Sequence, residues 1–103
     1  MKTKKFNVIG TMSGTSCDGL DIAYCSFWRE NKFWKYSLNK SEFEPYTNTL
    51  NKKLLECSHL NSYDLKKLDI ELGEFAADKL LNFIKKNAIK PSLISTHGHT
   101  VLH

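Results

Sequence analysis

The sequence predicts an α/β protein in which three antiparallel strands are followed by two helices and a fourth strand. Three observations support this fold class. Stretches rich in β-forming residues alternate with short polar connectors up to residue 45, apolar residues then recur every three or four positions, and a short apolar run follows Pro91. The predicted element order is therefore β-β-β-α-α-β.

The first three strands are predicted from composition and from the turns between them. Residues 5–11 and 20–28 combine β-branched and aromatic side chains, and in residues 33–43 large side chains alternate with polar ones. The connector at residues 29–32 is polar, and its Asn31 can adopt a left-handed conformation at little cost. We expect these strands to form an antiparallel meander.

The two helices are predicted from capping residues and apolar spacing. A short helix is expected after Thr47 or Asn48, either of which can be its N-cap. A longer helix is expected to begin at Asn61 or Ser62 and to end at Asn87 as its C-cap. Its apolar residues form one stripe for packing onto a sheet, and they are Leu65, Leu68, Leu72, Phe75, Ala76, Leu80 and Phe83.

The fourth strand is predicted at residues 92–95, a short apolar run expected to be buried, and it leads into a polar loop at residues 96–100. A meander followed by a helical crossover and another strand is typical of a ribonuclease-H-like mixed sheet. The helices are expected on one face only. We therefore expect the sheet to be incomplete and the natural domain to continue past His103.

The composition, with 41% hydrophobic and 25% charged residues, is that of an ordinary globular protein. No apolar run is long enough to cross a bilayer or to act as a leader. Cys17, Cys25 and Cys57 are odd in number and form no C-x-x-C pair, which favours reduced thiols and a cytoplasmic location. The net charge of +4 raises a nucleic-acid hypothesis, but the basic residues are scattered lysines apart from Arg29. We therefore expect no nucleic-acid partner and no membrane partner.

The most informative stretch is residues 10–21, GTMSGTSCDGLD, in which almost every position is small, hydroxylated or acidic. A polyphosphate requires close approach of the backbone, several donors and a metal ion that offsets its charge. Gly14 would let the main chain approach the phosphates, the hydroxyls would donate, and Asp18 and Asp21 would act through Mg²⁺ or its waters. The stretch is neither a Walker A loop nor a dinucleotide fingerprint.

The alternative interpretation is an ordinary hairpin connection that is rich in turn-forming residues. A hairpin between well-formed strands usually needs only two to five residues. The segment between the first two predicted strands is longer than that. Its length therefore favours a binding function over simple chain reversal.

Residues 12–21 resemble the M-S-G-T-S-x-D-G-[VL]-D opening of anhydro-N-acetylmuramic acid kinases, which belong to the superfamily of hexokinase, Hsp70 and actin. Residues 95–103, STHGHTVLH, are similar to that family's H-G-Q-T-V-x-H, and residues 72–78 resemble the helix segment before it. The likeness covers the whole chain. The clear departure is His99, because the family carries glutamine there.

The resemblance implies that residues 1–103 are the N-terminal part of the first domain of a two-domain actin-like ATPase, with the remainder of the kinase absent from this chain. It also implies a reaction in which ATP phosphorylates the 6-oxygen of 1,6-anhydro-N-acetylmuramic acid while water opens the anhydro ring. The products are N-acetylmuramate 6-phosphate and ADP, and the process is peptidoglycan recycling. Members of the family are commonly dimers, which leaves a homodimer as one option.

Site residues follow from the resemblance by motif. Residues 96–100 would lie near the sugar, with His97 and Thr100 as its hydrogen-bonding contacts. The family's general base is an aspartate in a later D-T-G-P-G-N motif, so no catalytic residue is expected here and the 103 residues alone are expected to be inactive. ATP and Mg²⁺ are the expected cofactors, with Asp18 and Asp21 on the metal. The residues expected to bind ATP are Ser13, Gly14, Thr15, Ser16, Cys17, Asp18, Gly19, Leu20 and Asp21.

Two other functions stay open on the sequence. A non-catalytic ATP-binding fragment would contain the same turn, and a reading frame that continues into the D-T-G-P-G-N motif would exclude it. His97, His99 and His103 also resemble the T-H-x-H-x-D-H motif of metal hydrolases, but residues 101–102 are Val-Leu where an aspartate is required. We expect substrate-side or internally hydrogen-bonded histidines rather than a metal site.

Overall fold

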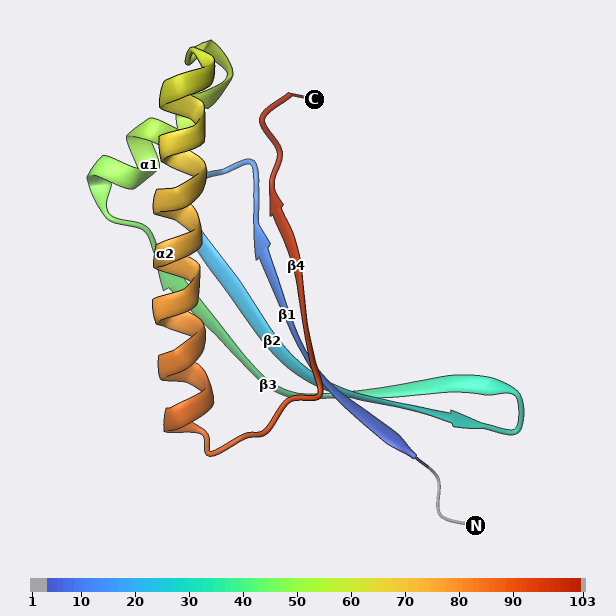
Figure 1. Ribbon diagram of the computed structural model, residues 1–103. Coiled ribbons are helices and arrows are strands. Elements are labelled where there is room, and N and C mark those ends of the chain that lie inside the picture. Colours follow the sequence, from blue (N-terminus) through green and yellow to red (C-terminus); the bar gives the residue numbers. More distant parts are fainter. Residues whose placement is uncertain (1–3, 103) are drawn as a thin grey trace.

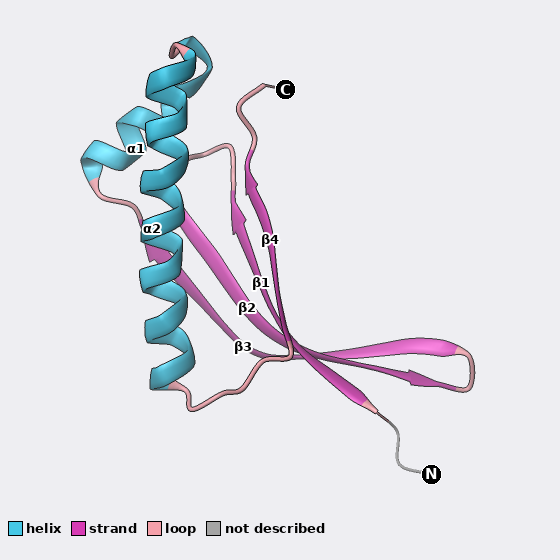
Figure 2. Cartoon of the chain, viewed as in Figure 1, coloured by secondary structure: helices cyan, strands magenta, loops and turns pink. Residues whose placement is uncertain are grey.

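The computed structural model describes residues 4–102 and confirms the predicted element order. Four strands form one mixed sheet, and two α-helices joined by a short 3₁₀ helix lie against it (Figure 1, Figure 2). The elements are β1 (Lys5–Ser13), β2 (Gly19–Glu30), β3 (Phe33–Pro45), α1 (Asn48–Leu55), η1 (Cys57–His59), α2 (Ser62–Lys86) and β4 (Leu93–His99).

The strands lie in the order β3-β2-β1-β4. β1 pairs antiparallel with β2, and β2 pairs antiparallel with β3, which is the predicted meander. β4 pairs parallel with the other edge of β1, so α1, η1 and α2 form the crossover between β3 and β4. Both α-helices lie on the same face of the sheet, as predicted (Figure 1).

The helix ends are set by the predicted capping residues. The Thr47 hydroxyl accepts a hydrogen bond from the Leu50 N–H at 3.1 Å and caps α1. The Asn61 side chain accepts from the Asp64 N–H at 2.8 Å and caps α2, and Asn87 is the C-cap of α2. Each N-cap satisfies an N–H group that the helix itself cannot pair, which contributes about 1 kcal/mol to stability.

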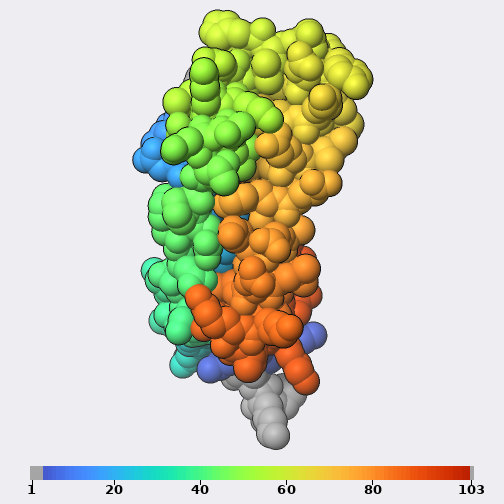
Figure 3. Space-filling model, turned by 90° about the vertical axis from the view of Figure 1, so that its left-hand side faces the viewer, coloured from blue at the N-terminus to red at the C-terminus, as the bar shows by residue number. Residues whose placement is uncertain are grey.

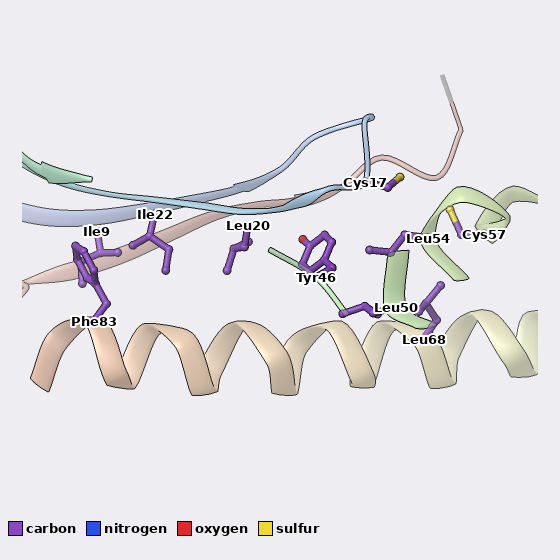
Figure 4. Packing of buried hydrophobic residues seen from close by; sticks show 10 residues of the cluster. All are labelled: Ile9, Cys17, Leu20, Ile22, Tyr46, Leu50, Leu54, Cys57, Leu68 and Phe83. Carbon is purple, nitrogen blue, oxygen red and sulfur yellow. The ribbon is translucent and has the colours of Figure 1, made fainter. Parts of the chain in front are cut away.

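The core lies between α2 and the face of the sheet that it covers (Figure 4). At one end Phe83 of α2 packs with Ile9 and Ile22, and all three are almost fully buried. Burial of each such side chain contributes about 1.5–3 kcal/mol. Further along α2, Leu68 is buried close to Leu50 of α1. The space-filling view from this side shows α2 lying beside α1 and part of β3 (Figure 3).

The opposite face of the sheet is not covered in the described part of the chain. Met12 and Phe43, which point to that face, are 48% and 50% exposed. Successive side chains of a strand point to opposite faces. Accordingly, Ile9, Thr11 and Ser13 of β1 are buried on the helix side. No helix within residues 4–102 combines the length and apolar character needed to cross a membrane.

β1 and β2 both reach further into the connection between them than the sequence predicts. The ladder continues through the pairs Met12↔Asp21 and Ser13↔Leu20, so only residues 14–18 connect β1 to β2. Five residues lie within the ordinary range for a hairpin. The inference that the length of this connection indicates binding was therefore wrong, because the hydroxylated and acidic residues on either side of the turn are parts of strands.

β4 also differs from its prediction in extent and in burial. It continues to His99 rather than ending at residue 95, so most of the predicted polar loop is strand. Leu93 and Ile94 are 59% and 47% exposed rather than buried. The physical reason is that, within residues 4–102, β4 lies at the sheet edge and pairs only with β1.

Candidate functional site

The turn at residues 14–18 is held in place by hydrogen bonds from three directions. Within the turn, the Cys17 N–H donates to the Gly14 carbonyl at 3.1 Å, and Cys17 has a left-handed φ of 58°. From outside, the Tyr46 N–H donates to the Asp18 carbonyl at 2.9 Å and the Asn51 side chain donates to the Cys17 carbonyl at 2.6 Å. The turn is thus anchored to the end of β3 and to α1.

The outer part of the turn is open. Thr15, Ser16 and Asp18 are exposed, and within residues 4–102 no protein acceptor pairs with the backbone N–H of Thr15 or Ser16. A Cβ atom on Gly14 would meet nothing nearer than the Ser16 hydroxyl at 4.0 Å. The fold itself does not require glycine at position 14, so the bare backbone there is free to approach a ligand.

Two of the predicted phosphate-binding residues point inward instead. Ser13 and Cys17 are each only 3% exposed. The Ser13 hydroxyl accepts from the Tyr46 hydroxyl at 2.6 Å and lies 2.9 Å from His99 Nδ1. Cys17 Sγ lies 3.6 Å from His99 Nε2 and donates to the Thr15 carbonyl at 3.4 Å. These two side chains are engaged within the molecule.

Burial is the main cause that raises the pKa of the Cys17 thiol above its ordinary value, and nearby Cys57 and Asp18 add to it. Burial also raises the pKa of the Tyr46 hydroxyl, although its hydrogen bond to Ser13 acts in the opposite direction. Both shifts extend toward alkaline pH the range over which these two groups keep their protons.

Gly19 and Leu20, also predicted to bind ATP, form the start of β2 and are both buried. A Cβ atom on Gly19 would lie 2.4 Å from the Glu44 carbonyl oxygen and 2.6 Å from the Phe43 ring. This glycine is required because β3 approaches so closely. The Leu20 side chain belongs to the core.

A bulge in β4 separates the two histidines of the predicted substrate segment. β4 pairs Thr96 with Thr11 and His99 with Ser13, so it has one residue more than β1 over this interval. Gly98 has a φ of +74°, a left-handed conformation that suits glycine. As a result His97 lines a hollow on the uncovered face of the sheet, while His99 lies on the helix side beside Ser13.

This separation argues against the metal-hydrolase alternative. Without the bulge, His97 and His99 would lie on the same face of the strand. With it, they lie on opposite faces. Within residues 4–102 no group of three or more histidine, cysteine or acidic residues is arranged to hold a metal ion. His103, the third histidine of the motif, lies outside the described residues.

The remaining predicted residues gather in two hollows. Thr15 and Thr100, which belong to two separate motifs, line the same hollow of about 160 Å³ between the turn, α1 and the end of β4. Asp21 and His97 line a larger open hollow of about 750 Å³ on the uncovered face. The structure therefore brings the two motifs to one end of the sheet but divides their side chains between its two faces.

Asp18 and Asp21 are both exposed, one in the turn and the other three residues further along in β2. Mg²⁺ is usually bound by one or two carboxylates together with substrate phosphates and water. Two exposed carboxylates beside a turn that can bind phosphate fit that set of ligands.

Tyr46 and Asn51 were missed by sequence reasoning. Tyr46 contacts Ser13 at the end of β1, 33 residues away in sequence, and Asn51 contacts the Cys17 carbonyl, 34 residues away. Neither contact has a local sequence signal. Only the packing of α1 and the end of β3 against the turn places these side chains there.

The class of protein follows from comparison with known sequences. The profile of a kinase family, described as anhydro-N-acetylmuramic acid kinase, matches residues 6–103. The chain belongs to the anhydro-N-acetylmuramic acid kinase family. The match includes the turn, both helices and β4, so it covers both motifs that the structure brings together.

Curated proteins similar to the chain carry the same name. The anhydro-N-acetylmuramic acid kinase of Caldanaerobacter subterraneus subsp. tengcongensis is 34% identical over 102 residues, which cover 93% of this chain and 26% of the relative. That of Microcystis aeruginosa is 36% identical over 99 residues, with coverages of 93% and 26%. That of Vibrio vulnificus is 34% identical over 109 residues, with coverages of 100% and 28%. The chain thus spans about a quarter of the length of these relatives.

Proposed function

We propose that the complete protein is an ATP-dependent sugar kinase that converts 1,6-anhydro-N-acetylmuramic acid to N-acetylmuramate 6-phosphate, with water opening the anhydro ring. The chain's membership in the family supports the proposal. The structural observation that carries it is the turn at residues 14–18. It presents exposed hydroxyls, and backbone N–H groups without a partner in residues 4–102, around a glycine that the fold does not require.

The turn supplies the donors that phosphoryl transfer needs. The backbone N–H groups of Thr15 and Ser16 and their hydroxyls would bind phosphate oxygens of ATP, and Gly14 would allow their close approach. Ser13 and Cys17 would support the turn through their internal hydrogen bonds, since their side chains are buried rather than facing solvent. Gly19 and Leu20 would fix the exit of the turn into β2.

Mg²⁺ would be held by Asp18 and Asp21 through its waters, and it would neutralise charge on the transferred phosphate. The carboxylates cannot contact phosphate directly without repulsion. Both are exposed next to the turn, as this role requires.

The sugar would bind near the end of β4, where Thr100 shares a hollow with Thr15 and His97 faces the other side of the sheet. We further propose that residues 1–103 form the N-terminal part of the first of two actin-like domains, that the enzyme is cytoplasmic, and that it can form a homodimer. We assign no general base within these residues.

The proposal is tested by measuring ADP release from ATP by the complete protein with and without the anhydro sugar, comparing the wild type with Gly14→Ala. We expect sugar-dependent ADP release in the wild type. In Gly14→Ala we expect the KM for ATP to rise about tenfold or more, because the added methyl group blocks backbone approach to the phosphates.

Gly73→Ala is the matched control, because Gly73 lies in α2 and a Cβ atom there meets nothing within 4 Å. This variant should keep the wild-type KM for ATP. Wild-type protein that releases no ADP with the sugar contradicts the proposed reaction. An unchanged KM in Gly14→Ala contradicts the role of the turn.

A further inference from the structure

A continuous series of side-chain contacts runs from the end of β3 to the turn at residues 14–18. The Tyr46 hydroxyl donates to Ser13 Oγ at 2.6 Å. Ser13 Oγ lies 2.9 Å from His99 Nδ1, and His99 Nε2 lies 3.6 Å from Cys17 Sγ. Cys17 Sγ then donates to the Thr15 carbonyl at 3.4 Å. We call these four side chains the relay.

One assignment of protons satisfies all four contacts of the relay. Because Tyr46 donates to Ser13, the Ser13 hydroxyl keeps its own proton for a further contact, and we assign His99 Nδ1 as the acceptor of that proton. In this assignment the imidazole is neutral and its single proton is on Nε2, pointing to Cys17 Sγ, while the Cys17 thiol proton goes to the Thr15 carbonyl.

The relay is built into the fold rather than lying on its surface. Ser13 and Cys17 are 3% exposed and Tyr46 is 7% exposed. The His99 ring reaches them only because the bulge at Gly98 turns it to the helix side of the sheet. The ring thereby contacts Ser13 just before the turn and Cys17 within it.

We infer that His99 is a positioning residue that fixes the turn at residues 14–18 relative to the end of β4. The inference rests on the proposed function, in which the turn takes the ATP phosphates and Thr100, next in sequence to His99, contacts the sugar. Thr15 and Thr100 line one hollow, and the His99 ring lines it with them. The relay holds the two walls of this hollow at a fixed separation, which sets the alignment of the two substrates.

The alignment matters because phosphoryl transfer depends on positioning, and a displacement of about 1 Å can cost on the order of a hundredfold in rate. His99→Phe keeps a ring but removes both hydrogen bonds. His99→Gln keeps an amide oxygen that can accept from Ser13 and an NH₂ group that can donate to Cys17. The pair therefore separates the loss of hydrogen bonding from the loss of the imidazole itself.

The kinetic test uses the complete protein and measures kcat and KM for ATP and for the anhydro sugar. We expect His99→Phe to lower kcat by on the order of ten- to a hundredfold, and His99→Gln to retain most of the wild-type kcat. His59→Phe is the matched control, because His59 is exposed at the end of η1 outside the relay, and it should behave as the wild type. A wild-type kcat in His99→Phe would overturn the inference.

A double-mutant cycle shows whether His99 acts through Cys17. We expect Cys17→Ala to lower kcat, and His99→Phe to lower it far less in the Cys17→Ala background than in the wild type. Full multiplicativity of the two effects would count against the relay.

An independent readout is the imidazole ¹⁵N spectrum of the complete wild-type protein at neutral pH. We expect the proton of His99 on Nε2, with Nδ1 unprotonated. A proton on Nδ1 contradicts the relay, whatever the kinetics show and even if a variant fails to fold. Absence of kinase activity in the wild type would instead contradict the proposed function, while the tautomer would still decide whether the relay exists.

Discussion

The sheet contains two hairpin connections, and they are built in opposite ways. The connection between β2 and β3 is residues 31–32, where Asn31 and Lys32 take left-handed φ values of 50° and 72°. Both are exposed, and within residues 4–102 no side-chain hydrogen bond reaches them. The connection between β1 and β2, residues 14–18, is instead tied to β3, to α1 and to β4. A turn that only reverses the chain needs local conformation, whereas a turn that must hold a ligand in register needs support from several elements.

The two connections also lie at opposite ends of the sheet. The hairpin of β2 and β3 extends away from α2, while residues 14–18 lie at the end where α1 packs and where β4 finishes (Figure 1). The well-supported end is the one at which both sequence motifs meet. Substitutions in and beside the two connections test whether this difference in support corresponds to a difference in function.

The largest expected effect is at the exit of the supported turn. Gly19→Ala places a methyl group against the Glu44 carbonyl, a backbone atom that cannot move aside cheaply. We expect the free energy of unfolding of the complete protein to fall by about 1–3 kcal/mol. Denaturant titration of Gly19→Ala, with Gly73→Ala as the control, measures this loss of stability. Equal midpoints for the two variants would contradict the close approach of β3 to Gly19.

The next effect concerns Asp18, the exposed carboxylate of the supported turn. Asp18→Asn keeps the size of the side chain but removes the charge that we assign to Mg²⁺. We expect turnover to fall at least about tenfold, which corresponds to about 1.4 kcal/mol in the activation barrier. Steady-state kinetics at saturating Mg²⁺ measures this, and unchanged turnover would refute the assignment.

A smaller effect is expected at the unsupported turn. Alanine lacks the short polar side chain that lets asparagine tolerate a left-handed conformation. We therefore expect Asn31→Ala to cost about 1 kcal/mol in stability. The KM for ATP should stay at its wild-type value. A rise in that KM would remove the functional contrast between the two connections.

The sequence predicted the fold better than the limits of its elements. Element order, the caps at Thr47 and Asn61 and the apolar stripe of α2 are local properties, and all were confirmed. The extension of β1 and β2 toward the turn was missed, because hydroxylated residues suit a turn and a strand equally well until tertiary packing chooses between them. The exposure of β4 was missed because a short apolar run does not reveal that it lies at a sheet edge.

The candidate site was predictable only in part. The motif located the turn, but it did not distinguish side chains that face solvent from those that hold the turn, such as Ser13 and Cys17. That distinction depends on strand alternation and on Tyr46, which is 33 residues away from Ser13. The opposite orientations of His97 and His99 depend on a bulge, which two histidines spaced by one glycine do not reveal.

The smallest effect is a pH dependence at the supported turn. Because the pKa of Cys17 is raised in the fold, stability from its neutral form is complete below the ordinary thiol value of 9.0 and is lost as the pH rises through the higher folded-state value. We expect the free energy of unfolding to decline on the alkaline side and Cys17→Ala to reduce that decline. Denaturant titrations across this range measure it, and identical slopes for both proteins would contradict the assignment.

Nucleotide binding by the turn at residues 14–18 is tested most directly by the backbone ¹H–¹⁵N spectrum of the complete protein, recorded during titration with Mg²⁺ and a non-hydrolysable ATP analogue. We predict that the amide signals of Thr15 and Ser16 shift in proportion to bound nucleotide, while those of Asn31 and Lys32 stay in place. Saturable nucleotide binding that leaves the amide signals of residues 14–18 unshifted would show that the nucleotide binds elsewhere.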